Sequence, residues 1–128
     1  MVDLSKYMHV GTITGAIATI KNFKYPGEVY AAPGVIKHIK KNHEDNLSKA
    51  ILNNLLGTMK NILNNPDYVG CDPKKVGTSL ELIKLIDDNI LLALQFDINE
   101  NYIYVASIYP VTESKIENRL YSNRIIKL

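Results

Sequence analysis

Cysteine, tryptophan and arginine are scarce in this chain of 128 residues, which has one Cys, no Trp and two Arg. The lone cysteine, Cys71, excludes an internal disulfide and is typical of a reducing compartment, so we expect a cytoplasmic protein. No apolar run reaches about 18 residues, so no membrane partner is expected. The first ten residues lack the pattern of a secretory signal. We expect a single globular domain over residues 1–128.

The basic residues differ in how much they indicate. The net charge of +2 is too small to indicate a polyanionic partner. Lysine, asparagine and isoleucine are all abundant, as in proteins encoded by A/T-rich genes. A single lysine is therefore weak evidence of a phosphate-binding site. The two arginines, Arg119 and Arg124, both fall within the last ten residues. Guanidinium groups bind phosphate in a forked geometry, so this pair is the stronger indication of a phosphate site.

Helical periodicity dominates the first half of the chain. A short apolar stretch after a Gly-Thr break predicts a helix started by Thr14, and residues 28–31 read as a short strand. The stretch "APGVIKHIKKNH", with Pro33 in its first turn, predicts a helix with one apolar face. Residues 46–64 predict a second, longer helix, which Pro66 ends.

The period changes after residue 78. Branched and aromatic residues separated by turn sequences predict three consecutive antiparallel strands, over 79–86, 89–97 and 102–109. Thr112 can then cap a short helix over 113–120, before a tail. The predicted fold class is α+β: N-terminal helices packed on one face of an antiparallel β-meander of about four strands, with a short C-terminal helix and tail.

Two of the three histidines, His38 and His43, lie five positions apart on the predicted helix. A spacing of five turns the second side chain about 140° from the first, which disfavours a shared metal, and no metal site is predicted. Both could be solvated helix residues. His38, however, adjoins the apolar stripe and is expected to be half-buried, while His43 lies where the helix should end. A half-buried histidine among lysines favours its neutral form, which a general base needs.

Other candidate residues have stronger structural interpretations. Cys71 could act as a nucleophile, but its surroundings favour a small buried residue. His9 has no evident partner. Strand tyrosines could stack on bases, although sheet packing is commoner, and Tyr109 is the one kept as a candidate because it lies at a strand end.

At this point the chain resembles phage-associated nucleases of the barnase–EndoU–colicin E5/D–RelE (BECR) superfamily. The segments that carry the likeness, in order, are "GTIT", "VIKHIKKNH", "NNPDYVG", "NYIYVASIYP" and "ESKIENRLYSNRIIK", from about residue 8 to the C-terminus. The resemblance implies a metal-independent endoribonuclease with its site on the open sheet face. Members of the superfamily act as toxins or phage-borne effectors, some against tRNA. It also implies RNA as partner, a cognate immunity or antitoxin protein, and delivery into a target cell if the chain is part of a toxin.

The resemblance also implies a set of site residues. Superfamily sites combine histidines with Lys, Arg, Tyr, Ser or Thr, in varying roles. The implied catalytic residues here are His38, His43, Thr112 or Ser114, and Arg124. Arg119 also matches a basic position of the family and is predicted to bind substrate. Lys40 and Lys41 are added as predicted phosphate-binding residues because the chemistry needs cations, and Tyr109 is added because it lies at a strand end.

Such chemistry needs few parts. The 2′-hydroxyl attacks its own phosphorus, so one group must take a proton, another must give one, and cations must stabilise the phosphorane. The product would be a 2′,3′-cyclic phosphate. The rival interpretation is a non-catalytic RNA-binding or protein-interaction module, which would use the basic tail and tyrosines without needing either histidine.

Overall fold

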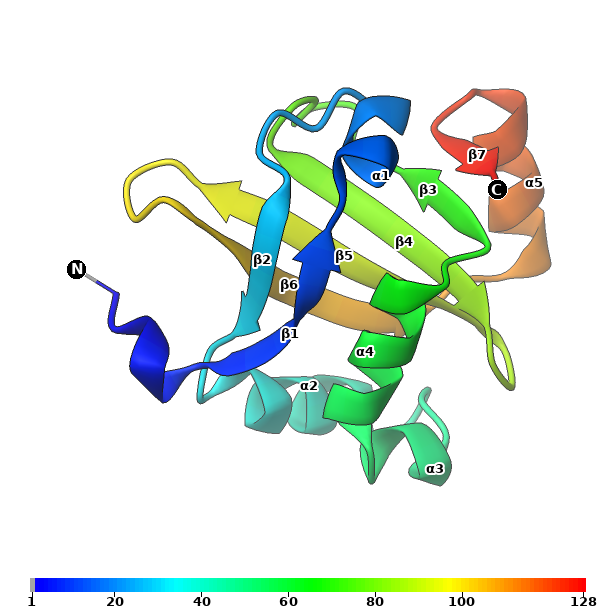
Figure 1. Ribbon diagram of the computed structural model, residues 1–128. Helices are drawn as coiled ribbons and strands as arrows, with labels where there is room; N and C mark the ends of the chain where they lie inside the picture. The colour runs from blue at the N-terminus through cyan, green and yellow to red at the C-terminus, as the bar shows by residue number, and fades with distance from the viewer. Residues whose placement is uncertain (1) are drawn as a thin grey trace.

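A computed structural model describes residues 2–128 and shows an α+β fold (Figure 1). The elements, in chain order, are a 3-10 helix η1 (Leu4–Lys6), β1 (Met8–Ile13), α1 (Gly15–Ile20), β2 (Gly27–Ala31), α2 (Val35–His43), α3 (Lys49–Leu52), α4 (Leu55–Asn64), β3 (Tyr68–Gly70), β4 (Ser79–Leu85), β5 (Asn89–Asp97), β6 (Tyr102–Pro110), α5 (Glu113–Tyr121) and β7 (Ile125–Lys127). No helix among residues 2–128 is long and apolar enough to cross a membrane.

The sheet is larger than the sequence predicts. Seven strands are joined in the order β1-β2-β6-β5-β4-β3-β7. The meander β4–β5–β6 is confirmed as predicted, and the other neighbours are also antiparallel except β2 and β6, which run parallel. The prediction of about four strands missed β1, β3 and β7. The glycine in β1 that indicated a break, Gly11, instead lets α4 approach, because a Cβ there would lie 2.5 Å from a methyl of Leu63.

The helices are largely as predicted, with one correction. Thr14 caps α1 by accepting a hydrogen bond from the backbone N–H of Ile17, and Thr112 caps α5 in the same way. The single helix expected over 46–64 is in fact two, α3 and α4, because Asn54 has a non-helical backbone between them. Asparagine competes with helical hydrogen bonding and favours such breaks.

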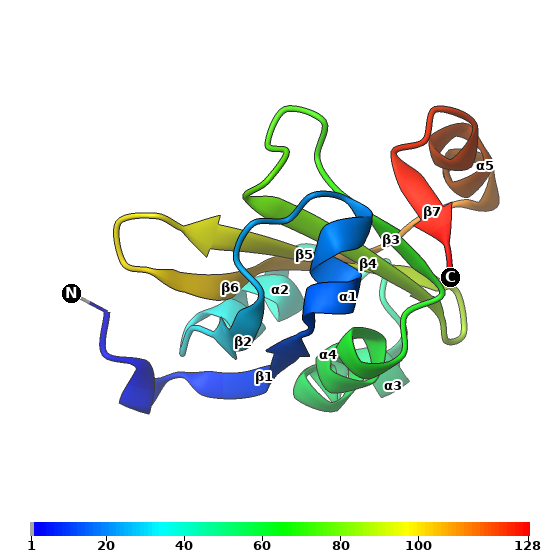
Figure 2. The same ribbon diagram turned by 45° about the horizontal axis from the view of Figure 1, so that its top comes forward.

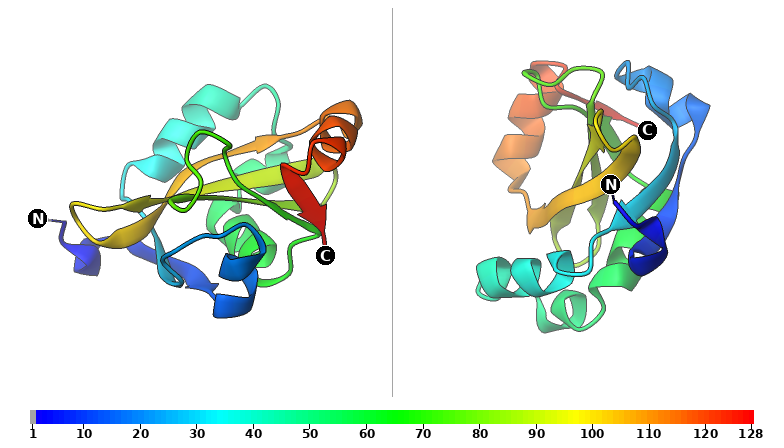
Figure 3. Two further views of the ribbon diagram at one scale, coloured as in Figure 1. Left: turned by 90° about the horizontal axis from the view of Figure 1, so that it is seen from above. Right: turned by 90° about the vertical axis from the view of Figure 1, so that its left-hand side faces the viewer.

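The main core lies between α4, the β1–β2 pair and the facing side of the meander. Leu80, Leu82 and Leu92 of the meander are fully buried there with Met59 and Ile62 of α4. In Figure 3, α1 and α4 lie on one side of the meander with β1 and β2, and α5 lies on the other.

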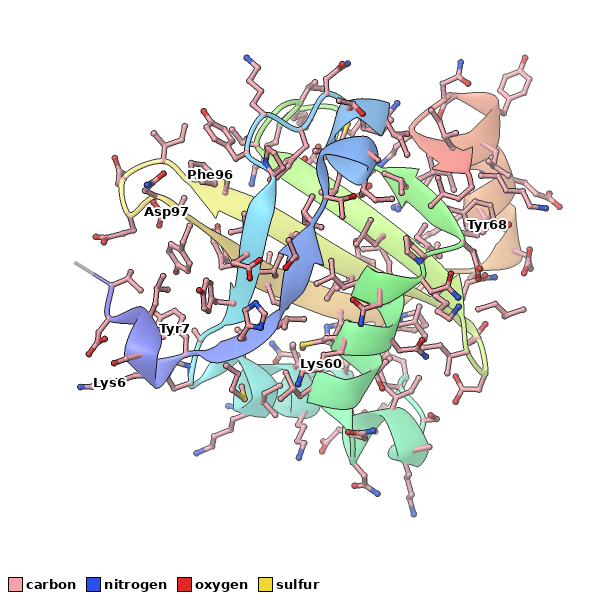
Figure 4. All side chains as sticks on the ribbon, viewed as in Figure 1. Lys6, Tyr7, Lys60, Tyr68, Phe96 and Asp97 are labelled. Carbon is pink, nitrogen blue, oxygen red and sulfur yellow. The ribbon has the colours of Figure 1, made fainter. Side chains whose placement is uncertain are left out.

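The opposite side of the meander, here called the outer face, carries a smaller core. Ile83 and Leu91 pack there against Ile116 of α5 and Ile125 of β7. Tyr68, partly buried in the same cluster, lies beside α5 (Figure 4). The expectation that helices cover only one face is therefore wrong, since α5 covers one end of the outer face.

Candidate active site

A buried carboxylate lies on the outer face in the middle of β4. The side chain of Glu81 is only 7% exposed. Its two oxygens accept hydrogen bonds from Arg124, whose Nε and Nη2 lie at 3.0 and 2.9 Å. Nη1 of Arg119 lies 3.9 Å from the Oε1 atom. The only two arginines of the chain therefore converge on one carboxylate, and we call Glu81, Arg119 and Arg124 the arginine cluster.

Local structure at the C-terminal end positions both arginines. The start of α5 is fixed by its Thr112 cap and by Asn89, whose side-chain amide donates to Glu113 at 2.6 Å. The last turn of α5 carries Arg119. The chain then reverses at Asn123, which has a φ of +59°, and enters β7 through Arg124.

The docking of β7 on β3 needs a glycine. A Cβ at Gly70 would lie 2.5 Å from the carbonyl oxygen of Arg124 and 2.6 Å from a methyl of Ile125. Contacts this short do not occur, so any larger residue at position 70 would push β7 away. Because β7 follows Arg124 directly, the position of this guanidinium over Glu81 depends on that close approach.

The arginine cluster carries unused positive charge. Two guanidinium groups face one carboxylate, which leaves one positive charge in excess. The hydrogen bonds that Arg124 donates to Glu81 raise the pKa of Arg124, so this group stays charged. Nη1 of Arg119 is buried and has no hydrogen-bond partner among residues 2–128. Buried donors are normally satisfied, so this nitrogen is an available donor for an anion.

Tyr109 and His43 lie next to the cluster. The ring of His43, at the end of α2, stacks on the ring of Tyr109 with centroids 6.3 Å apart and planes 26° from parallel. Burial raises the pKa of Tyr109, and Glu81 raises it further, while Arg119 and Arg124 oppose that rise. The phenol therefore keeps its proton at neutral pH. Nδ1 of His43 is buried and, within the described chain, lacks a hydrogen-bond partner.

His38 and its neighbouring lysines lie elsewhere on α2. His38 is exposed, and its Nε2 lies 2.9 Å from the side-chain amide of Asn42 one turn on. The expected half-burial of His38 is therefore wrong. Ile39 is the residue of this turn that is buried in the core. The side chain of His38, one position earlier, is rotated from it by about 100° around the helix axis. Lys40 and Lys41 are exposed in the last turn of α2.

The hydroxyl candidates lie at the beginning of α5. The Thr112 hydroxyl accepts a hydrogen bond from the backbone N–H of Lys115 at 3.3 Å, so it serves the helix cap. Ser114 is exposed in the first turn. Arg119, by contrast, lies in the last turn of the same helix. A catalytic role for either hydroxyl stays a prediction.

The remaining candidates have ordinary structural surroundings. His9 Nε2 lies 3.2 Å from Glu28, and its ring packs edge-on against Tyr30. Cys71 is buried, as expected. In the part of the chain that the structure describes, no three His, Cys, Asp or Glu side chains form a group that could hold a metal ion.

Sequence reasoning missed Glu81, although a signal was present. The acidic residue lies among apolar residues in the strand "SLELIKL", whose first five residues are all buried. A buried carboxylate needs a cationic partner, and arginine is the usual one. With only two arginines in the chain, the pairing could have been proposed from these facts together.

The arrangement offers cations and buried donors for an anion beside a histidine that can transfer a proton. Comparison with known protein families gives a match over residues 8–118 to a family described as phage-Barnase-EndoU-ColicinE5/D-RelE like nuclease 3. Neither the comparison with curated proteins nor that with solved structures gave a match.

Proposed function

The chain belongs to this family of phage-associated BECR-like nucleases, and we propose that it is a metal-independent endoribonuclease whose active site is the outer-face group of the arginine cluster, Tyr109 and His43. Family membership supports ribonuclease activity. The observation that carries the location is the convergence of both arginines on Glu81, with the His43–Tyr109 stack beside them.

The proposed roles follow from charge and burial. Arg119 and Arg124 bind the scissile phosphate and stabilise the charge that develops on the phosphorane, in a site where low exposure strengthens each interaction. Glu81 does not contact the substrate in this proposal. It is a positioning residue, because its two hydrogen bonds fix the plane of the Arg124 guanidinium.

Proton transfer is assigned to His43 and Tyr109. His43 takes the proton of the 2′-hydroxyl as that oxygen attacks phosphorus. Tyr109, which keeps its proton at neutral pH, gives a proton to the departing 5′-oxygen. The products are a 2′,3′-cyclic phosphate and a free 5′-hydroxyl. His38 is the alternative proton donor, and it would have to approach the substrate from the exposed side of α2.

The test is cleavage of RNA by the purified protein, first of total RNA and then of tRNA as a defined substrate. The expected products carry 2′,3′-cyclic phosphate ends, identified by mass spectrometry. The same sequence with a 2′-deoxy sugar at the cleaved position should not be cut. A His43→Ala control excludes contaminating nucleases. Binding of RNA without histidine-dependent cleavage would contradict the proposal and favour a non-catalytic RNA-binding module.

A further inference from the structure

A pocket of about 580 Å³ lies behind the arginine cluster. Its walls come from the end of α1, the loop between β3 and β4, and the last turn of α5 with the residues that follow it. In Figure 2 that loop rises above α1, and α5 and β7 lie to the right of both. Arg119 and Arg124 line the pocket, whereas Glu81, Tyr109 and His43 do not. The two arginines therefore separate this pocket from the proposed catalytic groups.

A third cation, Lys21, lines the pocket from the end of α1. Its Nζ donates to the carbonyl oxygen of Asn123 at 2.5 Å, which holds the ammonium group at the pocket. No carboxylate of residues 2–128 lies within ion-pair distance of Lys21. Asp72 acts on Arg124 electrostatically but is not among the lining residues. Three cations thus face two carboxylates, Glu81 and Asp72, and one positive charge remains in excess.

The rest of the lining suits a flat ring with polar edges. Cys71, Pro73 and Val76 form an apolar wall, and the side chains of Asn118 and Ser122 supply hydrogen-bonding groups. The volume falls within the range of about 300–1,000 Å³ that is usual for small-molecule sites. Positive charge, an apolar wall and amide or hydroxyl groups together match a nucleotide, whose phosphate, base face and base edge need these three environments.

We propose that this pocket binds one nucleotide of the RNA, adjacent to the scissile phosphate, and that Lys21 binds the phosphate of that nucleotide. The inference rests on the proposed function, because it assumes that the two arginines bind the scissile phosphate. The pocket on the other side of the arginines then receives the adjacent nucleotide. Arg119, whose Nη1 has no hydrogen-bond partner within residues 2–128, lines the pocket and also interacts with Tyr109 of the proposed catalytic group.

The experiment measures binding without cleavage. The probe is a short oligonucleotide carrying a 2′-O-methyl group on every sugar, and its affinity is followed by fluorescence anisotropy over a range of salt concentrations. Lys21→Gln should weaken binding several-fold and lower the salt slope by about one unit, since one phosphate contact is lost. Lys21→Arg should retain most of the affinity. Lys74→Gln, in the loop between β3 and β4 but outside the lining, should bind like the wild type.

A second variant guards against a folding effect, because Lys21 also contacts Asn123. Ser122→Asp introduces a carboxylate at the pocket without touching that contact and should also weaken binding. The proposal fails if both Lys21→Gln and Ser122→Asp bind like the wild type. It also fails if AMP alone binds as tightly as the oligonucleotide, which would assign the pocket to a free nucleotide. The probe cannot be cleaved, so its binding is measured independently of activity. If binding depends on Lys21 but the protein does not cleave ordinary RNA, the nucleotide pocket stands and only the proposed ribonuclease activity is overturned.

Discussion

Arg124 and Glu81 are joined by two hydrogen bonds across 43 positions of the chain. This pair links β4 to the segment that leads into β7 on the outer face. It also supplies a cation to a buried carboxylate, whose burial without one would cost on the order of several kcal/mol of folding free energy. The stability of the fold and the geometry of the proposed phosphate site therefore depend on the same contact.

We expect Glu81→Ala to destabilise the fold by about 3–5 kcal/mol, because two partly buried arginines would lose their common partner. The measurement is the free energy of unfolding by urea denaturation. Glu117→Ala, at an exposed position of α5, is the matched control and should change stability by less than about 0.5 kcal/mol. Similar stabilities for the two variants would mean that the arginines find other partners.

We expect His43→Ala to reduce turnover of RNA by about 10²-fold or more, as loss of a proton-transfer group does. From the sequence alone, a loss of the same order is expected for His38→Ala, and His38 is the more strongly favoured of the two because it lies within the helix. The structure leads us to expect a smaller loss for His38→Ala, since that side chain is exposed on the same helix. Comparison of the two rates under saturating substrate tests the assignment. A larger loss at His38 would reverse the proposed roles.

We expect Arg124→Ala to weaken RNA binding for all sequences and to lower the salt slope by about one unit. Lys60→Ala is the control, since Lys60 lies exposed on α4, away from the outer face (Figure 4). Stability must be measured in parallel, because Arg124→Ala also removes both hydrogen bonds that Glu81 accepts from Arg124. Equal weakening by both substitutions would indicate a diffuse cationic surface in place of a defined phosphate site.

We expect RNA cleavage to continue in excess EDTA, because the proposed chemistry uses only protein side chains and the 2′-hydroxyl. Cleavage rates with and without the chelator are compared on one defined substrate. Complete loss of activity that a divalent ion restores would overturn the mechanism. It would return attention to His38 and His43 with the neighbouring Glu44 and Asp45.

We expect stability to fall at alkaline pH, in part through Tyr102. Burial, aided by contact with Tyr7, raises the pKa of Tyr102 to about 12. The unfolded chain loses this proton near pH 10, so the stabilising contribution is complete below about pH 10 and is lost as the pH rises toward 12. Thermal unfolding from pH 8 to 12 should show a shallower fall in Tyr102→Phe. Tyr121→Phe, at a residue 92% exposed, is the control and should behave like the wild type.

Periodicity and turn residues were enough to predict much of the fold. The strand bounds 89–97 agree with β5, and both threonine caps were identified from residue type alone. The two shortest strands, β3 and β7, were not predicted because three residues are too few to show an alternating pattern. Both β3 and β7 owe their conformation to pairing with distant segments, β3 with β4 and β7 with β3. Such pairing follows from tertiary contacts that local propensity does not contain.

Part of the proposed site was also named from the sequence. Arg119, Arg124, Tyr109 and His43 were candidates from residue type and from the family resemblance, and the structure places them near one another, while their roles stay a prediction. Their organiser, Glu81, was missed because its importance depends on a pairing across 43 residues. The half-burial expected of His38 was wrong because a position beside an apolar stripe does not fix the direction of a side chain, which is set by where the helix axis lies relative to the core.

Chain order has a consequence for biosynthesis. Translation proceeds from the N-terminus, so the ribosome releases β4, β5 and β6 before it releases Arg119, Arg124 and β7. During that interval Glu81 is exposed to solvent or unpaired, and the nascent chain has neither guanidinium with which to bind a phosphate. If the protein cleaves RNA as proposed, the capacity to do so arises only once Arg119 and Arg124 have emerged and joined Glu81, later than the meander itself.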